Sequence, residues 1–286
     1  MTNNAKGLAL TSIGIFIMSV ESLLIKFTTI SSFVFSFYLG IFMFVSMLTT
    51  LLFKEKEYIK KAFKSSFGFL IICSIMMGAS NIFFITAVKT TTVANVVIIF
   101  STAALFSALF AYLFYKEKIT KNILYASFFM FIGLFIIFSD ELEFGSLKGN
   151  IFALFCTMLF SISFVLLSKY KDMDRIVLTA FSGIALSVIS FFLSDDLNID
   201  WNNLLVVIFM GLIISPFSRV LIGTGAKYIS ASEVSLLMLI ETMMAPVWVW
   251  IFLNEIPSSN TFIGGSIIIT TLIINSLYTL KKKELN

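Results

Sequence analysis

Ten runs of 17 to 23 mostly apolar residues fill this 286-residue chain, and short charged connectors join them. Because a helix needs about 20 apolar residues to cross the hydrocarbon of a bilayer, this pattern predicts ten membrane-spanning helices. With 59% hydrophobic and 13% charged residues, the chain has too little polar surface to coat a soluble globule. The predicted spans cover residues 7–26, 33–53, 67–88, 93–115, 122–138, 150–168, 176–193, 203–225, 231–253 and 262–280.

A repeat divides the chain into two halves. Residues 89–96 (KTTTVANV) correspond to residues 227–234 (KYISASEV), 138 positions later, and both segments open a long apolar run. The same offset separates Glu117 from Glu255, which follow the ends of those two runs. The two segments therefore begin the fourth and the ninth predicted span.

The beginnings of the two halves also match, because Lys6-Gly7 corresponds to Lys148-Gly149 at an offset of 142. We therefore predict an all-α polytopic membrane protein whose repeats are residues 1–141 and 142–286. Each repeat contains five spans, and an odd number of spans turns the second copy upside down in the bilayer. Inverted repeats of this kind, with a binding site between them, are typical of secondary transporters.

The basic residues predict the orientation. With a cytoplasmic N-terminus, 16 of the 20 lysines and arginines lie in inside segments, three lie outside and one lies within a span. This asymmetry predicts that both termini are cytoplasmic. The net charge of +4 reflects the same asymmetry and does not indicate nucleic-acid binding, since the basic residues are scattered over short loops. The three residues expected outside are Lys26, Lys89 and Lys148.

Residue usage argues against several other kinds of site. The chain has no histidine, and its two cysteines, Cys73 and Cys156, lie inside apolar runs. Neither a disulfide framework nor a CxxC metal site is available, so we expect no cofactor and no resident metal. The expected partners are a small-molecule substrate and the lipid bilayer, and the oligomeric state is open between a monomer and a homodimer.

The spans four and nine carry a resemblance to a known family. Tyr115-Lys116-Glu117-Lys118-Ile119-Thr120 ends the fourth span, and the ninth runs through Glu241-Thr242-Met243-Met244-Ala245-Pro246 to Leu253-Asn254-Glu255. This pattern resembles the EamA-domain branch of the drug/metabolite transporter superfamily. The resemblance implies a multi-pass transporter of a bacterial cell (inner) membrane that moves small metabolites such as amino acids, amines or nucleoside-like compounds. Many members have a proline in the fourth span, where this chain has Ala103-Ala104-Leu105-Phe106.

Charged residues within the spans are the candidates for substrate binding. A charge at the bilayer centre costs roughly 2.5 to 3.5 kcal/mol, so it is retained chiefly where it faces protein or water. Arg219 corresponds to Asn81 at the offset of 138, and we expect the two on opposite sides of a central cavity. The alternative is that Arg219 extends to the cytoplasmic headgroups.

Glu241 lies five residues before Pro246, which should kink the ninth span and free the carbonyl of Thr242. A carboxylate beside a free carbonyl suits an amine or a proton, and the alternative is a structural ion pair between Glu241 and Arg219. Pro216 precedes Arg219 by three residues and is a second kink candidate. We predict that Pro246 and Pro216 serve as gate or hinge positions.

Glu21 and Glu241 are the candidates for proton coupling, because a buried carboxylate is the natural proton carrier in a chain without histidine. The alternative for Glu21 is exposure to outer water. Trp248, seven residues after Glu241, is either part of an interfacial aromatic belt or a cation–π wall for an amine. Together these residues favour a zwitterionic or cationic substrate moved by alternating access, with proton or exchange coupling.

Two other classes of protein stay open as alternatives. The cluster Asp195, Asp196 and Asp200 resembles the aspartates with which lipid-modifying enzymes hold Mg²⁺ against a diphosphate. The cluster is expected on an outer loop and has no second cluster to complete it, so we expect a transporter and not an enzyme. A channel or a sensor is the other alternative.

Overall fold

The computed structural model describes residues 3–54, 67–116, 121–144, 147–170, 173–229 and 231–284, and every regular element within these ranges is helical. The all-helical expectation is therefore confirmed for this part of the chain. The end of the first repeat's fourth-span motif, residues 117–120, lies outside it. The elements are α1 (Asn3–Met18), α2 (Glu21–Phe27), α3 (Ser32–Leu52), α5 (Phe67–Thr90), α6 (Val93–Ser101), α7 (Ala103–Tyr115), α8 (Lys121–Phe144), α9 (Leu147–Lys169), α10 (Arg175–Leu193), α11 (Trp201–Phe209), the π-helix η1 (Met210–Ile214), α12 (Ser215–Gly225), α13 (Ala231–Leu253) and α14 (Ser259–Glu284).

Among the described residues, eight helical segments are long and apolar enough to cross a membrane. Three of them join consecutive elements: α1 with α2, α6 with α7, and α11 through η1 to α12. Two shorter apolar segments, Leu237–Leu253 and Ser259–Asn275, lie within α13 and α14. The chain is therefore a multi-pass membrane protein, and the count of ten spans stays a prediction.

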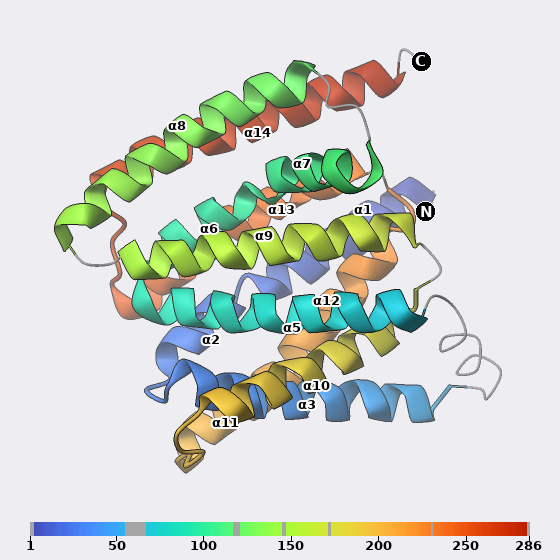
Figure 1. The fold of residues 1–286 in the computed structure, drawn as a ribbon, viewed down its shortest axis with the longest axis vertical. Helices are drawn as coiled ribbons and strands as arrows, with labels where there is room; N and C mark the ends of the chain where they lie inside the picture. The colour runs from blue at the N-terminus through green and yellow to red at the C-terminus, as the bar shows by residue number, and fades with distance from the viewer. Residues whose placement is uncertain are drawn as a thin grey trace.

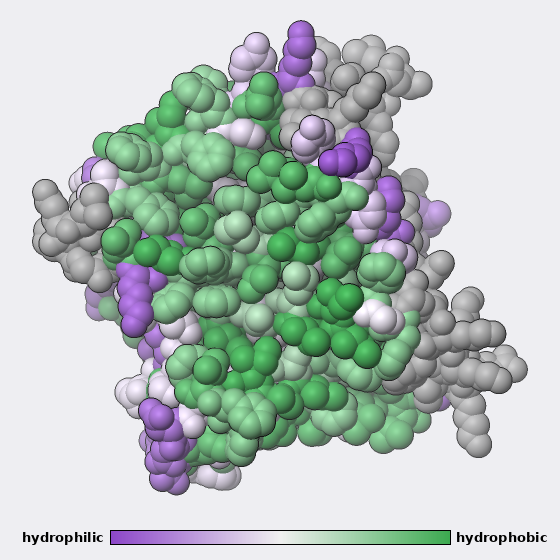
Figure 2. Space-filling model, viewed as in Figure 1, coloured by the Kyte–Doolittle hydropathy of each residue, from purple (hydrophilic) through white to green (hydrophobic). Residues whose placement is uncertain are grey.

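The long helices run side by side along a common direction, with the N-terminus and the C-terminus at the same side of the bundle (Figure 1). Hydrophobic residues cover the middle of the face seen in Figure 2, and hydrophilic residues gather near the helix ends on both sides. This band is what a helix bundle presents to lipid. We refer below to the side that holds both termini as the terminal side. Its assignment to the cytoplasm stays a prediction.

Close packing joins the halves in matching pairs: α1 packs on α12, and α5 packs on α9. Gly7 allows the first contact, because a Cβ there would lie 2.8 Å from the Cβ of Tyr228. Gly149 allows the second, because its Cβ would lie 2.9 Å from the backbone carbon of Thr90. Tyr228 follows Thr90 by 138 residues, and Gly149 follows Gly7 by 142. The same two offsets that define the sequence repeat therefore recur in the packing, as small residues permit at helix crossings.

Two apolar segments are interrupted where the sequence has no glycine or proline. The first breaks at Ser19 and Val20, between α1 and α2, and the Ser19 Oγ donates to the carbonyl of Phe16 at 2.7 Å. The fourth breaks at Thr102, whose Oγ1 donates to the carbonyl of Ile99 at 2.6 Å. Hydroxyl groups that bond to the preceding turn compete with the regular helix and favour a break. They do not determine one, because Thr157 makes the same kind of bond within the unbroken helix α9.

The two proline candidates behave differently. Pro216 has no N–H to give to the carbonyl of Leu212, one turn earlier, and the Oγ of Ser46 on α3 donates to that carbonyl instead at 2.8 Å. The π-helix η1 immediately precedes this proline. Pro246 lies within α13, which is helical on both sides of it.

Candidate functional site

A cavity of about 170 Å³ lies between the two halves of the bundle. Its wall contains two carboxylates and two guanidinium groups, contributed by α2, α10, α12 and α13, and an amide from α5. Aromatic rings on α5, α6 and α9 also line it. The charged and amide members are Glu21, Asn81, Arg175, Arg219 and Glu241, the hydroxyl members are Ser80, Thr179 and Ser182, and the rings are those of Phe84, Phe100, Phe160 and Phe164.

Arg219 lies at the centre of the polar group. Its Nη2 donates a hydrogen bond to the Oδ1 of Asn81 at 3.0 Å, and the same nitrogen lies 3.6 Å from the Oε2 of Glu21. Asn81 and Arg219 both line the cavity as expected, but they touch each other and do not face each other across it. A partly buried guanidinium needs acceptors within reach, and the amide of Asn81 and the carboxylate of Glu21 supply them.

Parts of this group have unused hydrogen-bonding capacity. Glu21 is 5% exposed, and its Oε1 has no hydrogen-bond partner, nor has the Nε of Arg219. Glu241 is also 5% exposed, and its carboxylate forms no ion pair or hydrogen bond with any residue that the structure describes. The alternative of a Glu241–Arg219 ion pair is therefore not what the structure contains, since Arg219 pairs with Glu21. Buried carboxylates with free oxygens favour a ligand or a proton at this place.

Arg175, the first residue of α10, also lines the cavity. Its Nε and Nη1 are buried without hydrogen-bond partners. The preceding Asp174 caps α10, because its Oδ1 accepts from the backbone N–H groups of Ile176 and Val177. Sequence reasoning counted Arg175 with the basic loops and missed this role. The available signal was its place directly after a helix cap, which makes it the first residue of the span and not part of the connector.

A second cavity, of about 200 Å³, lies beside the first, and we call it the side chamber. The two cavities share six lining residues, among which is Glu241. The other shared residues are Phe100, Phe160, Phe164, Val234 and Met238, and those found only in the side chamber are Ser101, Ala103, Ala104, Ser107, Thr242 and Leu272.

Trp248 lies away from both cavities. Its Nε1 donates to the Oγ of Ser19 at 3.0 Å, and its ring meets the ring of Phe16 edge-on at 5.9 Å between centroids. The residue thus holds the break between α1 and α2, two residues before Glu21. A cation–π wall at Trp248 does not match this geometry, because the indole faces α1 and is absent from the lining of either cavity.

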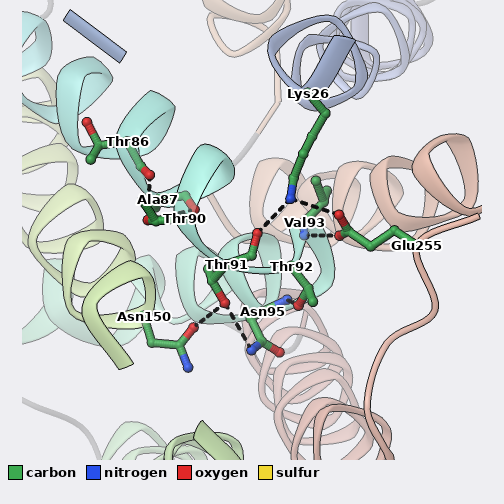
Figure 3. Close-up of polar contacts among 10 residues, drawn as sticks. All are labelled: Lys26, Thr86, Ala87, Thr90, Thr91, Thr92, Val93, Asn95, Asn150 and Glu255. Atoms are coloured by element: carbon green, nitrogen blue, oxygen red, sulfur yellow. Dashed lines mark hydrogen bonds and ion pairs between the residues drawn. The ribbon is translucent and has the colours of Figure 1, made fainter. Parts of the chain in front are cut away.

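Polar contacts join several helices at the side opposite the termini (Figure 3). Lys26, at the end of α2, pairs with the Oε2 of Glu255 at 2.8 Å and donates to the carbonyl of Thr91 at 2.9 Å. The Oε1 of Glu255 accepts from the backbone N–H of Val93 at 2.6 Å, at the start of α6. We call Lys26, Glu255, Thr91 and Val93 the closing cluster. It links α2, α6 and the segment after α13 across this end of the bundle.

The aspartates considered for an enzyme serve the local backbone. Asp196 accepts from the backbone N–H of Asn198, and Asp200 caps α11 by accepting from that of Asn203. The side chain of Asn203 also donates to Asp200, and these bonds hold the pKa of Asp200 below its ordinary value. Within the described residues, no group of three or more His, Cys, Asp or Glu side chains is arranged to hold a metal ion.

Known proteins give consistent comparisons. A profile of the EamA-like transporter family matches residues 5–139 and again residues 147–277. An uncharacterized transporter of Clostridium kluyveri is 28% identical over 240 residues, which span 76% of this chain and 73% of that protein. The uncharacterized transporter YdfC of Bacillus subtilis is 24% identical over 184 residues, 62% of this chain and 60% of YdfC. A solved crystal structure matches the fold with a TM-score of 0.68 at 12% identity, covering 96% of this chain and 98% of its own.

Proposed function

Because the chain belongs to the EamA-like transporter family, within the drug/metabolite transporter superfamily, we propose that it is a secondary active transporter. Its substrate is a small zwitterionic or cationic metabolite, such as an amino acid, an amine or a nucleoside-like compound. Transport proceeds by alternating access across a bacterial cell membrane, and the terminal side is the cytoplasm.

The charge inventory of the cavity is the observation that carries the substrate class. The wall contains two carboxylates, Glu21 and Glu241, and two guanidinium groups, Arg175 and Arg219, so their formal charges cancel. A zwitterion can therefore place its ammonium near a carboxylate and its carboxylate near a guanidinium. The sequence alone suggested one arginine against two acids, and Arg175 changes that count. A polyanion would have to displace Glu21 from Arg219 and would lie beside Glu241. An unpaired buried charge costs several kcal/mol, which disfavours such a ligand.

The shape of the cavity supports access from one side. Its lining extends from Glu21, the first residue of α2, to Arg175, at the start of α10, and Ala226, just after α12, on the terminal side. The closing cluster, which joins α2, α6 and the segment after α13, lies on the opposite side of the bundle. A cavity that reaches one side while polar contacts join the helices at the other side fits one state of an alternating-access cycle.

Coupling to protons is assigned to Glu241 or Glu21. Glu241 is buried in the cavity wall without a partner among the described residues, so it must either bind a cation or take up a proton. A substrate ammonium and a proton would then compete for one carboxylate. Such competition gives either proton antiport or exchange, because the carrier reorients only with the carboxylate neutralised.

A thermal-shift screen of purified protein against amino acids, amines, nucleosides and sugar phosphates tests the proposal. A ligand that binds only the folded state raises the melting temperature by mass action, and we expect this for zwitterions or amines. Glu241→Gln should weaken the binding of amines more than that of neutral analogues. The control is Asp196→Asn, which alters an exposed carboxylate on the outer loop and should leave binding unchanged. Stabilisation by a sugar phosphate alone would overturn the proposed substrate class.

A further inference from the structure

Two cavities meet at Glu241, and their common wall makes them parts of one binding space. The first, of about 170 Å³, contains the arginines and Glu21, whereas the side chamber, of about 200 Å³, contains none of these groups. The shared residues lie on α6, α9 and α13 and surround the junction. A ligand whose charged end lies at Glu241 therefore has two directions in which the rest of its atoms can extend.

The side chamber is suited to an apolar group and not to a charged one. The aromatic rings of Phe100, Phe160 and Phe164 and the side chain of Leu272 form its apolar wall, and Glu241 is its single ionisable residue among those described. Its remaining polar groups are the hydroxyls of Ser101, Ser107 and Thr242. These hydroxyls can bond to the preceding turn of their own helices, as Thr242 does to the carbonyl of Met238 at 3.4 Å.

Small side chains on α7 keep the chamber open. Ala103, Ala104 and Ser107 line it where larger residues would fill it. The helix α7 packs chiefly on α9, and the break at Thr102 separates it from α6 directly beside the chamber. Space at this position therefore follows from both the residue type and the helix interruption. A single substitution by a larger residue at Ala104 or Ser107 would fill the chamber.

We propose that the side chamber holds the apolar arm of the substrate, and that its size sets which arms are accepted. The proposal deepens the proposed function and rests on it: the substrate ammonium lies at Glu241, and a carboxylate, where present, faces Arg219. An apolar cavity of roughly 150 Å³ is large enough for a benzene molecule. The chamber therefore accepts a phenyl group or a branched aliphatic chain, and the substrate is an amino acid or amine that carries such an arm.

Burial of an arm in this chamber has a measurable size. Each methylene group moved from water into an apolar site gains about 0.8 kcal/mol, equivalent to roughly a fourfold change in affinity. Affinity should therefore rise from L-alanine to L-leucine to L-phenylalanine by tens-fold in total, as long as the chamber is free to receive the arm. Glycine and L-alanine, which place almost nothing in the chamber, report on the polar site alone.

Dissociation constants of the full chain in detergent, measured for glycine, L-alanine, L-leucine, L-phenylalanine, ethylamine and phenethylamine, test the proposal. Ala104→Phe should remove the gain of the larger ligands and leave L-alanine and ethylamine within about twofold. Ala104→Val should give an intermediate loss, and it carries the test if Ala104→Phe does not fold. Leu109→Phe, at an exposed position of the same helix that lines neither cavity, should leave all six constants unchanged.

The outcomes separate the chamber from the proposed function. Equal weakening of small and large ligands by Ala104→Val, or a full gain for L-phenylalanine in Ala104→Phe, overturns the chamber as the arm's site. Binding of L-alanine or ethylamine without any gain for the larger ligands in the unaltered protein overturns it too, and leaves the proposed function intact. If none of the six probes binds, the substrate class itself is wrong, and the chamber proposal falls with it.

Discussion

Arg219 donates a hydrogen bond to Asn81 at 3.0 Å, and the two residues hold equivalent positions of the two repeats, 138 residues apart. When two copies are related by a twofold axis, equivalent residues can touch only if both lie close to that axis. In the inverted-repeat arrangement that we propose, the contact marks the centre of the repeat pair, and it lies in the wall of the cavity. A ligand at this place contacts both halves at once, which fits the proposed alternating access.

Loss of the guanidinium at this centre should affect zwitterions most. Arg219→Ala leaves Glu21 buried without its cation. Removing one partner of a buried ion pair lowers the stability of the protein by about 3 to 5 kcal/mol. We expect L-alanine binding to fall more than tenfold and ethylamine binding to change much less, because only the zwitterion needs the arginine. Isothermal titration with Arg219→Lys as the control measures this. Binding of a sugar phosphate that is indifferent to Arg219→Ala would show that the cavity has been misread.

The carboxylates should separate coupling from exchange. If Glu241 or Glu21 carries the proton, its replacement by glutamine abolishes gradient-driven accumulation in proteoliposomes and leaves substrate exchange, which needs only the loaded carrier to reorient. Uptake driven by a pH gradient and counterflow of labelled substrate are the two measurements. Retention of pH-driven uptake in both single variants removes the proton role from these residues.

The glycines at the two close helix crossings, Gly7 and Gly149, should each lower the stability of the protein when replaced by alanine. Gly7→Ala and Gly149→Ala would each bring a Cβ to within 2.6 Å of a side-chain carbon on the facing segment. Overpacking of this kind costs typically 1 to 3 kcal/mol, which exceeds the helix-propensity gain of about 1 kcal/mol from glycine to alanine. Both variants should melt at a lower temperature in detergent. Gly68→Ala, which has open space around its Cβ, should be neutral or stabilising.

Much of this architecture follows from local chemistry along the sequence. Apolar runs such as 93–115 predict helices because no other structure except a closed barrel satisfies the backbone in lipid. The offset of 138 pairs Asn81 with Arg219 from the sequence alone. These features are local or periodic, so a single sequence contains them.

The partner of Arg219 is a feature that the sequence does not contain. The choice between Glu21 and Glu241 depends on how α1 packs on α12, and that packing is set by shapes such as Gly7 against Tyr228. The break before Glu21 has the same origin, because Trp248, 229 residues after Ser19, bonds to the hydroxyl at that break. Serine and valine at positions 19 and 20 alone predict no interruption. The side chamber likewise requires the placement of α7 relative to α13.

Reporter fusions test the predicted orientation. Reporters fused after Lys64 and after Lys171, which both lie outside the described residues, should be cytoplasmic, and one placed near Asp196 should be outside. The reason is the excess of lysine and arginine in the connectors on the terminal side. Alkaline phosphatase and fluorescent-protein fusions in cells give the two readouts. A cytoplasmic signal near Asp196 would overturn the inverted-repeat argument, because an odd number of spans in each half is what turns the second copy over.

The closing cluster should control opening toward the side opposite the termini. Glu255→Gln removes the ion pair with Lys26 but keeps a side-chain oxygen that can accept from the N–H of Val93, so it isolates the charge. The ion pair is partly exposed, since both side chains are 21% accessible to solvent. Its loss should therefore shift the equilibrium between the closed and open states by only about 1 kcal/mol, or roughly fivefold. We expect Glu255→Gln and Lys26→Met each to increase outside access about fivefold, and the double variant to add little further.

A cysteine in the cavity measures this access. Met238→Cys, with Cys73 and Cys156 replaced by serine, places a thiol in the wall shared by the two cavities. A membrane-impermeant maleimide added from outside reacts with that thiol only while the outer side is open, so the labelling rate follows the open population. Asp195→Asn, an exposed carboxylate on the same side, is the control and should leave the rate unchanged. Equal labelling rates in the parent, Glu255→Gln and Lys26→Met would mean that the closing cluster holds the helices together without gating them, since a gate must change the population that it closes.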